Sequence, residues 1–176
     1  ENGEGNYLSA DLDVGDAYYG GNSMILRGAV KQGVSSKIEM YRASLPITDT
    51  MIFTTTARAR GAETALDAIL TLEDGTEVRL EGDKKVSDNW TTVQYSLSEL
   101  AGKTIQGISY QLTPEADAGG LQFRFGNITL LEPEAEEQAS VSNVEVLDSE
   151  FDEDAMYAGV RLAWESDVPT DYYEIY

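Results

Sequence analysis

Short runs of alternating apolar and polar residues recur between Met24 and Leu131. In MILRGAV, Met24 and Leu26 share a face, and SSKIEMYR places Ile38 and Met40 on one face with charged residues on the other. A period of two is typical of strands with one buried and one solvated face. Further strands are expected in MIFTTTARA, ALDAILTL, TEVRL, VQYSL, TIQGISYQLT and LQFRFGNITLL. The pattern predicts about eight strands.

Turn signals separate these strands at intervals of about 8–12 residues, which favours a two-layer sandwich over a parallel α/β sheet. The strongest signal is Asp74-Gly75 between two alternating segments, because both central positions of a two-residue hairpin turn take positive φ. The segment from Asn6 to Leu12 alternates only loosely. It is expected to form a leading loop before the acidic turn DVGDAYYGGNS.

The composition changes after the last of these strands. There is no Lys or Arg from Glu132 to Asp154, and EPEAEEQAS combines a proline with acids whose repulsion extends a chain. Residues 134–140 are therefore expected to link a sandwich in residues 1–133 to a second unit in residues 141–176. VSNVEVLDSEF, YAGVRLAWE and DYYEIY predict three strands there, with Trp164 in the core. A complete sandwich of this kind needs about 100 residues, so we expect the second one to be truncated.

Charge and the missing residue types narrow the chemistry. The chain has 32 acids, 12 bases and a net charge of −20, which repels phosphate backbones and anionic lipids but not a neutral sugar. Neither nucleic acid nor membrane insertion is expected. Without cysteine or histidine there are no disulfides, thiol nucleophiles or imidazole bases. Serine–histidine and cysteine–histidine mechanisms are thereby excluded for this chain.

Several motifs together resemble a known family. AYYGGNSMILRG, SSKIEMYRASLPIT, NWTTVQYSLSELAGKTIQGISYQL and LQFRFGNITLLEP, followed by YAGVRLAWE, are similar in order to the accessory region of glycoside hydrolase family 85, the endo-β-N-acetylglucosaminidases. The resemblance covers most of the chain after about Asp11. It implies a galactose-binding-like jelly roll and the start of a fibronectin type III-like (Ig-like) sandwich, in an extracellular or cell-surface bacterial protein. The family's catalytic residues lie in a separate barrel, and no segment here matches them.

Three functions follow as hypotheses. In the first, the chain is a non-catalytic module without a required cofactor that supports the catalytic barrel of the same parent chain; it predicts an exposed apolar patch. In the second, it is an autonomous carbohydrate-binding module that recognises N-glycan oligosaccharides through exposed Tyr18, Tyr19 and Trp90, for which packing is the alternative. In the third, paired acids act as a glycosidase, although Asp152-Glu153-Asp154 reads as solvated charge.

A structural calcium ion is a further hypothesis. Asp11, Asp13 and Asp16 lie close to Asn22 in the sequence, and the resemblance implies an ion between the first and last strands of the jelly roll. Carboxylate and amide oxygens are the ligands that calcium takes, so the expected ligands are Asp11, Asp16 and Asn127. The alternative is solvated turn acids and Asx-turns, which form without metal.

Overall fold

The computed structural model describes residues 1–18, 20–132, 141–152 and 157–166. Contacts divide the chain into two compact units, Glu1–Pro133 and Glu134–Tyr176. The described elements are strands apart from one short 3₁₀ helix, η1 (Ser98–Leu100), so the predicted all-β fold is confirmed. Within the described ranges no helix has the length and apolar character of a membrane span.

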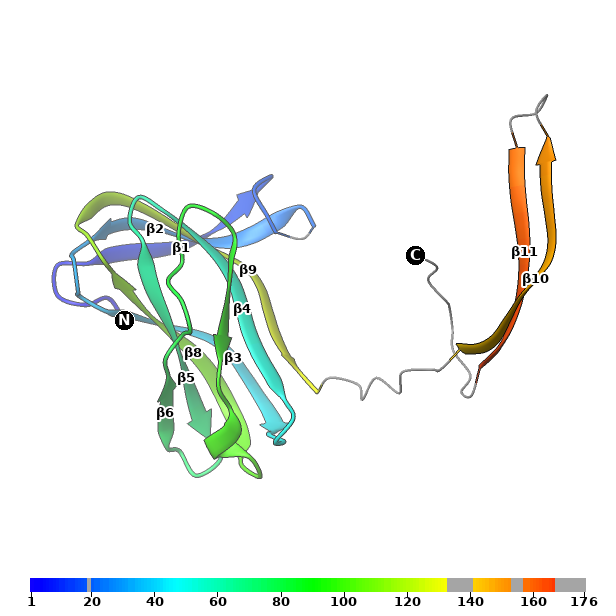
Figure 1. Ribbon diagram of the computed structural model, residues 1–176. Coiled ribbons are helices and arrows are strands. Elements are labelled where there is room, and N and C mark those ends of the chain that lie inside the picture. Colours follow the sequence, from blue (N-terminus) through cyan, green and yellow to red (C-terminus); the bar gives the residue numbers. More distant parts are fainter. Residues whose placement is uncertain (19, 133–140, 153–156, 167–176) are drawn as a thin grey trace. The chain divides into compact units, whose positions relative to one another are not determined.

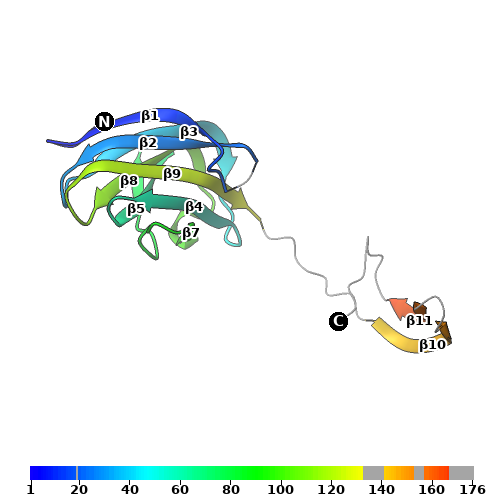
Figure 2. The same ribbon diagram turned by 90° about the horizontal axis from the view of Figure 1, so that it is seen from above.

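The first unit is a jelly-roll sandwich of two antiparallel sheets (Figures 1 and 2). One sheet has the order β1-β2-β9-β4-β7 and the other has the order β3-β8-β5-β6. The strands are β1 (Tyr7–Val14), β2 (Asn22–Val30), β3 (Ser36–Pro46), β4 (Ile52–Arg60), β5 (Thr64–Leu72), β6 (Glu77–Leu80), β7 (Thr91–Tyr95), β8 (Thr104–Pro114) and β9 (Ala118–Leu131). Neighbouring strands are mostly distant in sequence, as the sandwich prediction requires.

One apolar core fills the space between the two sheets. Alternate residues of β5 and β9 point into it, among them Leu70 and Phe123, both with no exposed surface. Tyr110 is equally buried, and its hydroxyl lies 2.5 Å from Thr55 Oγ1. Burial raises the pKa of Tyr110 and of Tyr95, so both phenols stay protonated and each needs a partner. Tyr95 donates to the carbonyl oxygen of Leu66 at 3.3 Å.

The prediction of a leading loop at Asn6 to Leu12 is wrong for most of that segment, because Tyr7–Val14 forms the edge strand β1. It pairs antiparallel with β2 from Tyr7 opposite Ala29 to Val14 opposite Asn22. The residues of β1 in fact alternate regularly, with Leu8, Ala10, Leu12 and Val14 on one face and Ser9, Asp11 and Asp13 on the other. The apolar face of this edge strand is only partly covered, since Leu12 is 61% exposed.

The hairpin predicted at Asp74-Gly75 is confirmed, but its turn differs from the one expected. β5 and β6 pair antiparallel, and Gly75 N–H donates to the carbonyl oxygen of Leu72 at 2.9 Å. Only Gly75 has a positive φ, of 83°. Asp74 instead accepts the backbone N–H of Thr76 on its carboxylate at 2.9 Å, the side-chain mechanism by which Asp favours turns.

The second unit contains an antiparallel strand pair, β10 (Val141–Asp152) and β11 (Tyr157–Ser166). These are the first two strands expected after the linker. Trp164 is half-buried in β11. The predicted linker 134–140 and the third predicted strand, DYYEIY, lie outside the described residues.

Candidate functional site

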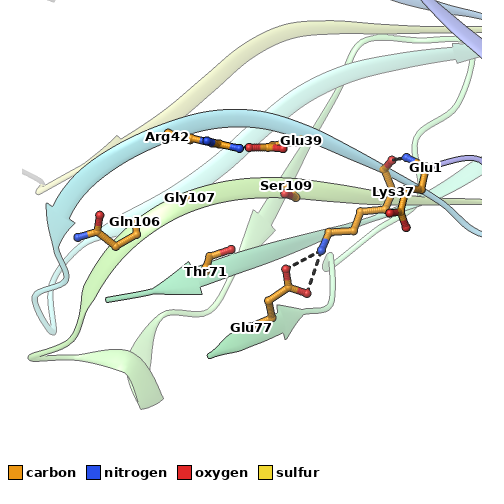
Figure 3. A pocket seen from close by; sticks show the side chains of 9 residues that line it. All are labelled: Glu1, Lys37, Glu39, Arg42, Thr71, Glu77, Gln106, Gly107 and Ser109. Carbon is orange, nitrogen blue, oxygen red and sulfur yellow. Dashed lines mark hydrogen bonds and ion pairs between the residues drawn. The ribbon is translucent and has the colours of Figure 1, made fainter. Parts of the chain in front are cut away.

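The outer face of the four-stranded sheet carries a polar groove of about 420 Å³. Strands β3, β8, β5 and β6 supply all but one of its lining residues (Figure 3). The lining consists of Glu1, Lys37, Glu39, Arg42, Thr71, Glu77, Gln106, Gly107 and Ser109. On β8, Gly107 and Ser109 alternate with the core residues Ile108 and Tyr110. The groove is thus the solvated side of a sheet whose other side holds the core.

An ion pair crosses this groove from one edge of the sheet to the other. Lys37 Nζ on β3 lies 2.7 and 2.8 Å from the two carboxylate oxygens of Glu77 on β6 (Figure 3). Because β8 and β5 lie between these two strands, the paired side chains pass above both. We call the Lys37–Glu77 pair the crossbar.

The crossbar requires that the outer face is hollow. In the register of the sheet, Lys37 is opposite Gln111 of β8, and Gln111 is opposite Asp67 of β5. Glu77 is opposite Thr71, which lies four residues farther along β5. In a flat sheet, three strand spacings of about 4.8 Å and four residues of about 3.3 Å would separate the two Cα atoms by roughly 20 Å, which is farther than the two side chains reach. The twist of the sheet must therefore raise these two corners toward each other.

Two side chains of the outer face are covered although they point away from the core; Ser109 lines the groove and Ile69 lies beside it. Ile69 on β5 and Ser109 on β8 are opposite each other in register, midway between the levels of Lys37 and Glu77. Ile69 is 7% exposed and Ser109 is 6% exposed. Ile69 does not belong to the core cluster, so outer-face groups must cover it. The line from Lys37 to Glu77 crosses the level of Ile69 and Ser109, and Arg79, opposite Ile69 on β6, is bonded to Asp67 at 2.6 Å.

A second ion pair lies along β3. Arg42 Nε donates to Glu39 Oε1 at 2.6 Å, and this hydrogen bond holds the pKa of Glu39 below its usual value. Both side chains are largely solvated, so the pair contributes little stability. Gln106 and Thr71 also line the groove, which therefore offers both hydrogen-bond donors and hydrogen-bond acceptors. This suits hydroxyl groups better than it suits a single strong charge.

The aromatic residues proposed as sugar platforms lie elsewhere, on the five-stranded sheet. The rings of Tyr18 and Trp90 are 5.5 Å apart and tilted by 54°. Both lie against Gly126 of β9, where a Cβ would fall 2.5 Å from Tyr18 Cβ and 2.8 Å from Trp90 Cζ3. Tyr18 is 39% exposed and Trp90 is half-buried, while Tyr19 lies outside the described residues. Tyr18 and Trp90 pack on each other and on the strand, and their role in sugar binding stays a prediction.

The acids proposed as calcium ligands contact arginines. Arg124, whose side chain is 6% exposed, has Nη2 2.7 Å from Asp13 and Nε 3.3 Å from Asp16. Arg58 also reaches Asp16, at 3.4 Å, and Arg27 reaches Asp11 at 3.7 Å. Their guanidinium groups supply the positive charge that the sequence argument assigned to an ion.

Asn127, the third proposed ligand, donates from its side-chain amide to Thr129 Oγ1 at 2.9 Å. Among the described residues no group of three or more acids is arranged to hold a metal ion. Calcium binding by Asp11, Asp16 and Asn127 stays a prediction. Melting the protein in calcium and in chelator would test it.

Several apolar side chains of β1 and of a neighbouring groove are exposed. Leu12 and Val14 are 61% and 76% exposed, and register places them next to Met24 and Asn22 of β2. A groove of about 390 Å³ adjoins them, lined in part by Met24, Met40 and Tyr41, of which Tyr41 is 53% exposed. We define the apolar patch as Leu12, Val14, Met24, Met40 and Tyr41. The first sandwich is therefore not uniformly polar.

Sequence reasoning missed the groove because its residues come from four strands spread between Lys37 and Ser109. The available signal was the polar half of each alternation. It identifies the solvated face, but it does not say which polar residues gather in a hollow.

No protein-family model matches the chain, and comparison with the curated proteins finds no match. Among solved structures, the chain is similar to the glycoside hydrolase domain Spr0440, Endo-D, of Streptococcus pneumoniae R6, with 26% identity and a TM-score of 0.61. The match covers 93% of this chain and 26% of that chain. This share exceeds what the first unit alone supplies, so the similarity continues into the second unit.

Two carbohydrate-binding modules share the fold. One, of the β-sandwich superfamily, has 13% identity and a TM-score of 0.56 over 72% of this chain and 54% of that one. The other is the family 11 module of the cellulase Lic26A-Cel5E from Clostridium thermocellum, with 13% identity and a TM-score of 0.50 over 76% of this chain and 86% of that one. The first unit thus has the β-sandwich fold of carbohydrate-binding modules. The similarity to Endo-D adds a link to glycoside hydrolases.

Proposed function

We propose that this chain is a non-catalytic accessory module of a secreted endo-β-N-acetylglucosaminidase that acts on N-glycans. The observation that carries the proposal is the 26% identity to Endo-D over 93% of the chain. The chain spans about a quarter of that glycoside hydrolase domain, which leaves ample sequence for a catalytic barrel elsewhere in such a protein. In this proposal the second unit is the start of a fibronectin type III-like sandwich.

The apolar patch favours a role for the first unit in supporting a catalytic domain. Leu12, Val14 and Tyr41 each expose more than half of their surface, and contiguous exposed apolar side chains on a soluble domain are typical of contact surfaces. A net charge of −20 opposes association of two copies. We therefore assign the patch to the catalytic domain of the same polypeptide.

The test is titration of the chain with the catalytic domain expressed separately from the same polypeptide. Leu12→Glu places a charge in the patch and is expected to weaken binding at least tenfold, because an unpaired charge would be desolvated in the contact. Leu131→Glu is the matched control, since Leu131 is 44% exposed and lies outside the patch. Equal losses in both variants, or no binding by the unmodified chain, would contradict this docking surface.

A second candidate function, binding of a neutral glycan, is favoured by the groove on the four-stranded sheet. Its amide, hydroxyl and paired charged groups are suited to the hydroxyls of a sugar. A groove this open predicts weak binding, with Kd on the order of 10⁻³ to 10⁻⁵ M, or about 4–7 kcal/mol.

Calorimetric titration with a trimannosyl N-glycan core tests this candidate. Gln106→Ala removes a polar group of the groove and is expected to weaken binding about fivefold or more. Gln94→Ala makes the same change on β7 of the other sheet and is expected to leave the affinity unchanged. A flat trace from folded protein would count against glycan binding.

A further inference from the structure

We propose that the Lys37–Glu77 crossbar is a displaceable cover over the groove, and that a neutral glycan reaches the floor only after this ion pair opens. The inference rests on the proposed glycan binding and adds how the site is regulated. It assigns the cover to two residues at opposite edges of one sheet, and the binding surface beneath it to Ile69 and Ser109.

The first argument is the burial of Ile69. Its neighbours in β5, Ala68 and Leu70, point into the core, so Ile69 points outward, yet it is only 7% exposed. Its register partners on the outer face are Ser109 and Arg79. Arg79, opposite Ile69 on β6, is held by Asp67 at 2.6 Å, and the line from Lys37 to Glu77 crosses the level of Ile69. We infer that Arg79 and the crossbar together cover Ile69, since lysine methylene groups cover apolar surface well. The pair therefore lies between the floor and any ligand in solution.

The second argument is that opening the cover requires little free energy. The side chains of Lys37 and Glu77 are 34% and 53% exposed, so both groups are partly solvated while the pair is closed. Ion pairs of this exposure favour the closed form at most about fivefold, which corresponds to about 1 kcal/mol. The apparent affinity of a ligand that needs the open form is reduced by the fraction that is open.

The third argument concerns what opening provides. It uncovers the side of Ile69 that the crossbar covers, an apolar surface for the C–H face of a sugar ring, next to the hydroxyl of Ser109. It also frees the ammonium group of Lys37, which can bind sugar hydroxyls. With a chain charge of −20, an anionic glycan is repelled. The ligand class is therefore a neutral oligosaccharide.

The experiment compares Glu77→Ala with the unmodified chain, using calorimetric titration with the trimannosyl N-glycan core in about 0.05 M and 0.5 M NaCl. The variant is expected to bind two- to fivefold more tightly at low salt, because it has no closed form. Salt screens the exposed pair, so raising it should strengthen binding by the unmodified chain and leave the variant unchanged. A group that merely contacts the ligand would not produce this salt dependence.

Glu115→Ala is the matched control, because Glu115 forms an exposed ion pair with Lys85 at 2.9 Å outside the groove. It makes the same change in net charge and should not alter the affinity. Thermal melting checks that all three proteins are folded. Binding by Glu77→Ala alone would also support the crossbar as a cover.

The remaining outcomes overturn the inference. Equal or weaker binding by Glu77→Ala, with binding by the unmodified chain intact, would reject the cover and leave glycan binding standing. If neither protein binds the glycan at either salt concentration, glycan binding is wrong and the cover fails with it.

Discussion

Arg124 illustrates how a single residue can hold acids that lie far from it in the sequence. Its guanidinium group on β9 contacts Asp13 and Asp16, two acids that sequence alone would assign to solvent or to calcium. Burying a cation between two carboxylates has a desolvation cost. Removing the cation alone costs more stability, because it leaves the carboxylates without their partner. The end of β1, through Asp13, and the loop that follows it, through Asp16, are therefore joined to β9 by charge.

Replacing Arg124 with methionine should destabilise the first unit by about 2–3 kcal/mol. The change leaves Asp13, which is 15% exposed, with Arg27 as its one ionic partner among the described residues. It also removes Nη1, which is buried without a hydrogen-bond partner among the described residues, and this offsets part of the loss. Urea unfolding at an unchanged slope would measure the difference.

Arg60→Met is the control for that measurement. Arg60 joins the same network at Asp88 but is 50% exposed, so its loss should cost less than about 1 kcal/mol. If the two substitutions lower the free energy of unfolding equally, the burial of Arg124 adds nothing to the stability that this residue provides.

At the scale of elements, β9 is the strand on which the five-stranded sheet depends. It pairs with β2 on one side and with β4 on the other. The register with β4 is irregular between Thr56 and Ala57, opposite Gly126, and Tyr18 and Trp90 lie against that glycine. The absence of a side chain at Gly126 lets the aromatic pair approach the backbone.

Gly126→Ala should therefore destabilise the sandwich by about 1–3 kcal/mol, because the added methyl group would overlap Tyr18 and Trp90. Gly119→Ala, in the same strand, meets nothing within 4 Å and should change the stability by less than about 1 kcal/mol. Thermal melting of both variants compares them directly. A large loss at position 119 or none at position 126 would contradict this account.

Most strands could be predicted because burial on one face imposes a period of two on sequences such as ALDAILTL. The edge strand β1 was missed although Leu8, Ala10, Leu12 and Val14 alternate with polar residues, because its last acid, Asp13, was assigned to the turn that follows. The Asp74-Gly75 hairpin was predicted from its residues, yet its turn places only Gly75 at positive φ.

The candidate site was less predictable than the fold. The crossbar depends on the twist of a whole sheet, which brings Lys37 within reach of Glu77 across two intervening strands. Aromatic residues near predicted loops suggested a sugar platform, but the structure packs Tyr18 and Trp90 on each other. Proximity between distant strands is set by tertiary geometry that no local pattern encodes.

For the whole molecule, the dominant electrostatic fact is a net charge of −20 on 176 residues. The ion pairs of the first unit are mostly exposed, as for Lys31–Asp117, with side chains 58% and 63% exposed, and each contributes little. Repulsion among the unpaired acids acts over the entire surface and is strongest in the compact state.

Salt should accordingly raise the melting temperature by several degrees. Going from about 0.02 to 0.2 M NaCl shortens the screening length to below about 10 Å, so repulsion between distant acids falls more than the attraction between two groups in contact. The rise should level off above about 0.2 M, which distinguishes screening from the continuing effect of a stabilising salt. A melting temperature that falls over the first step would mean that ion pairs outweigh repulsion.

The position of β9 in the chain also governs the order in which the sandwich can be assembled. The strand that joins β2 to β4 is the last of the first unit to be synthesised. Roughly 100 residues separate the end of β2 from the end of β9, and ribosomes add about 5–20 residues per second. The first two strands therefore wait about 5–20 s beside the ribosome with one edge unpaired, and this molecule spends its most aggregation-prone interval before it is complete.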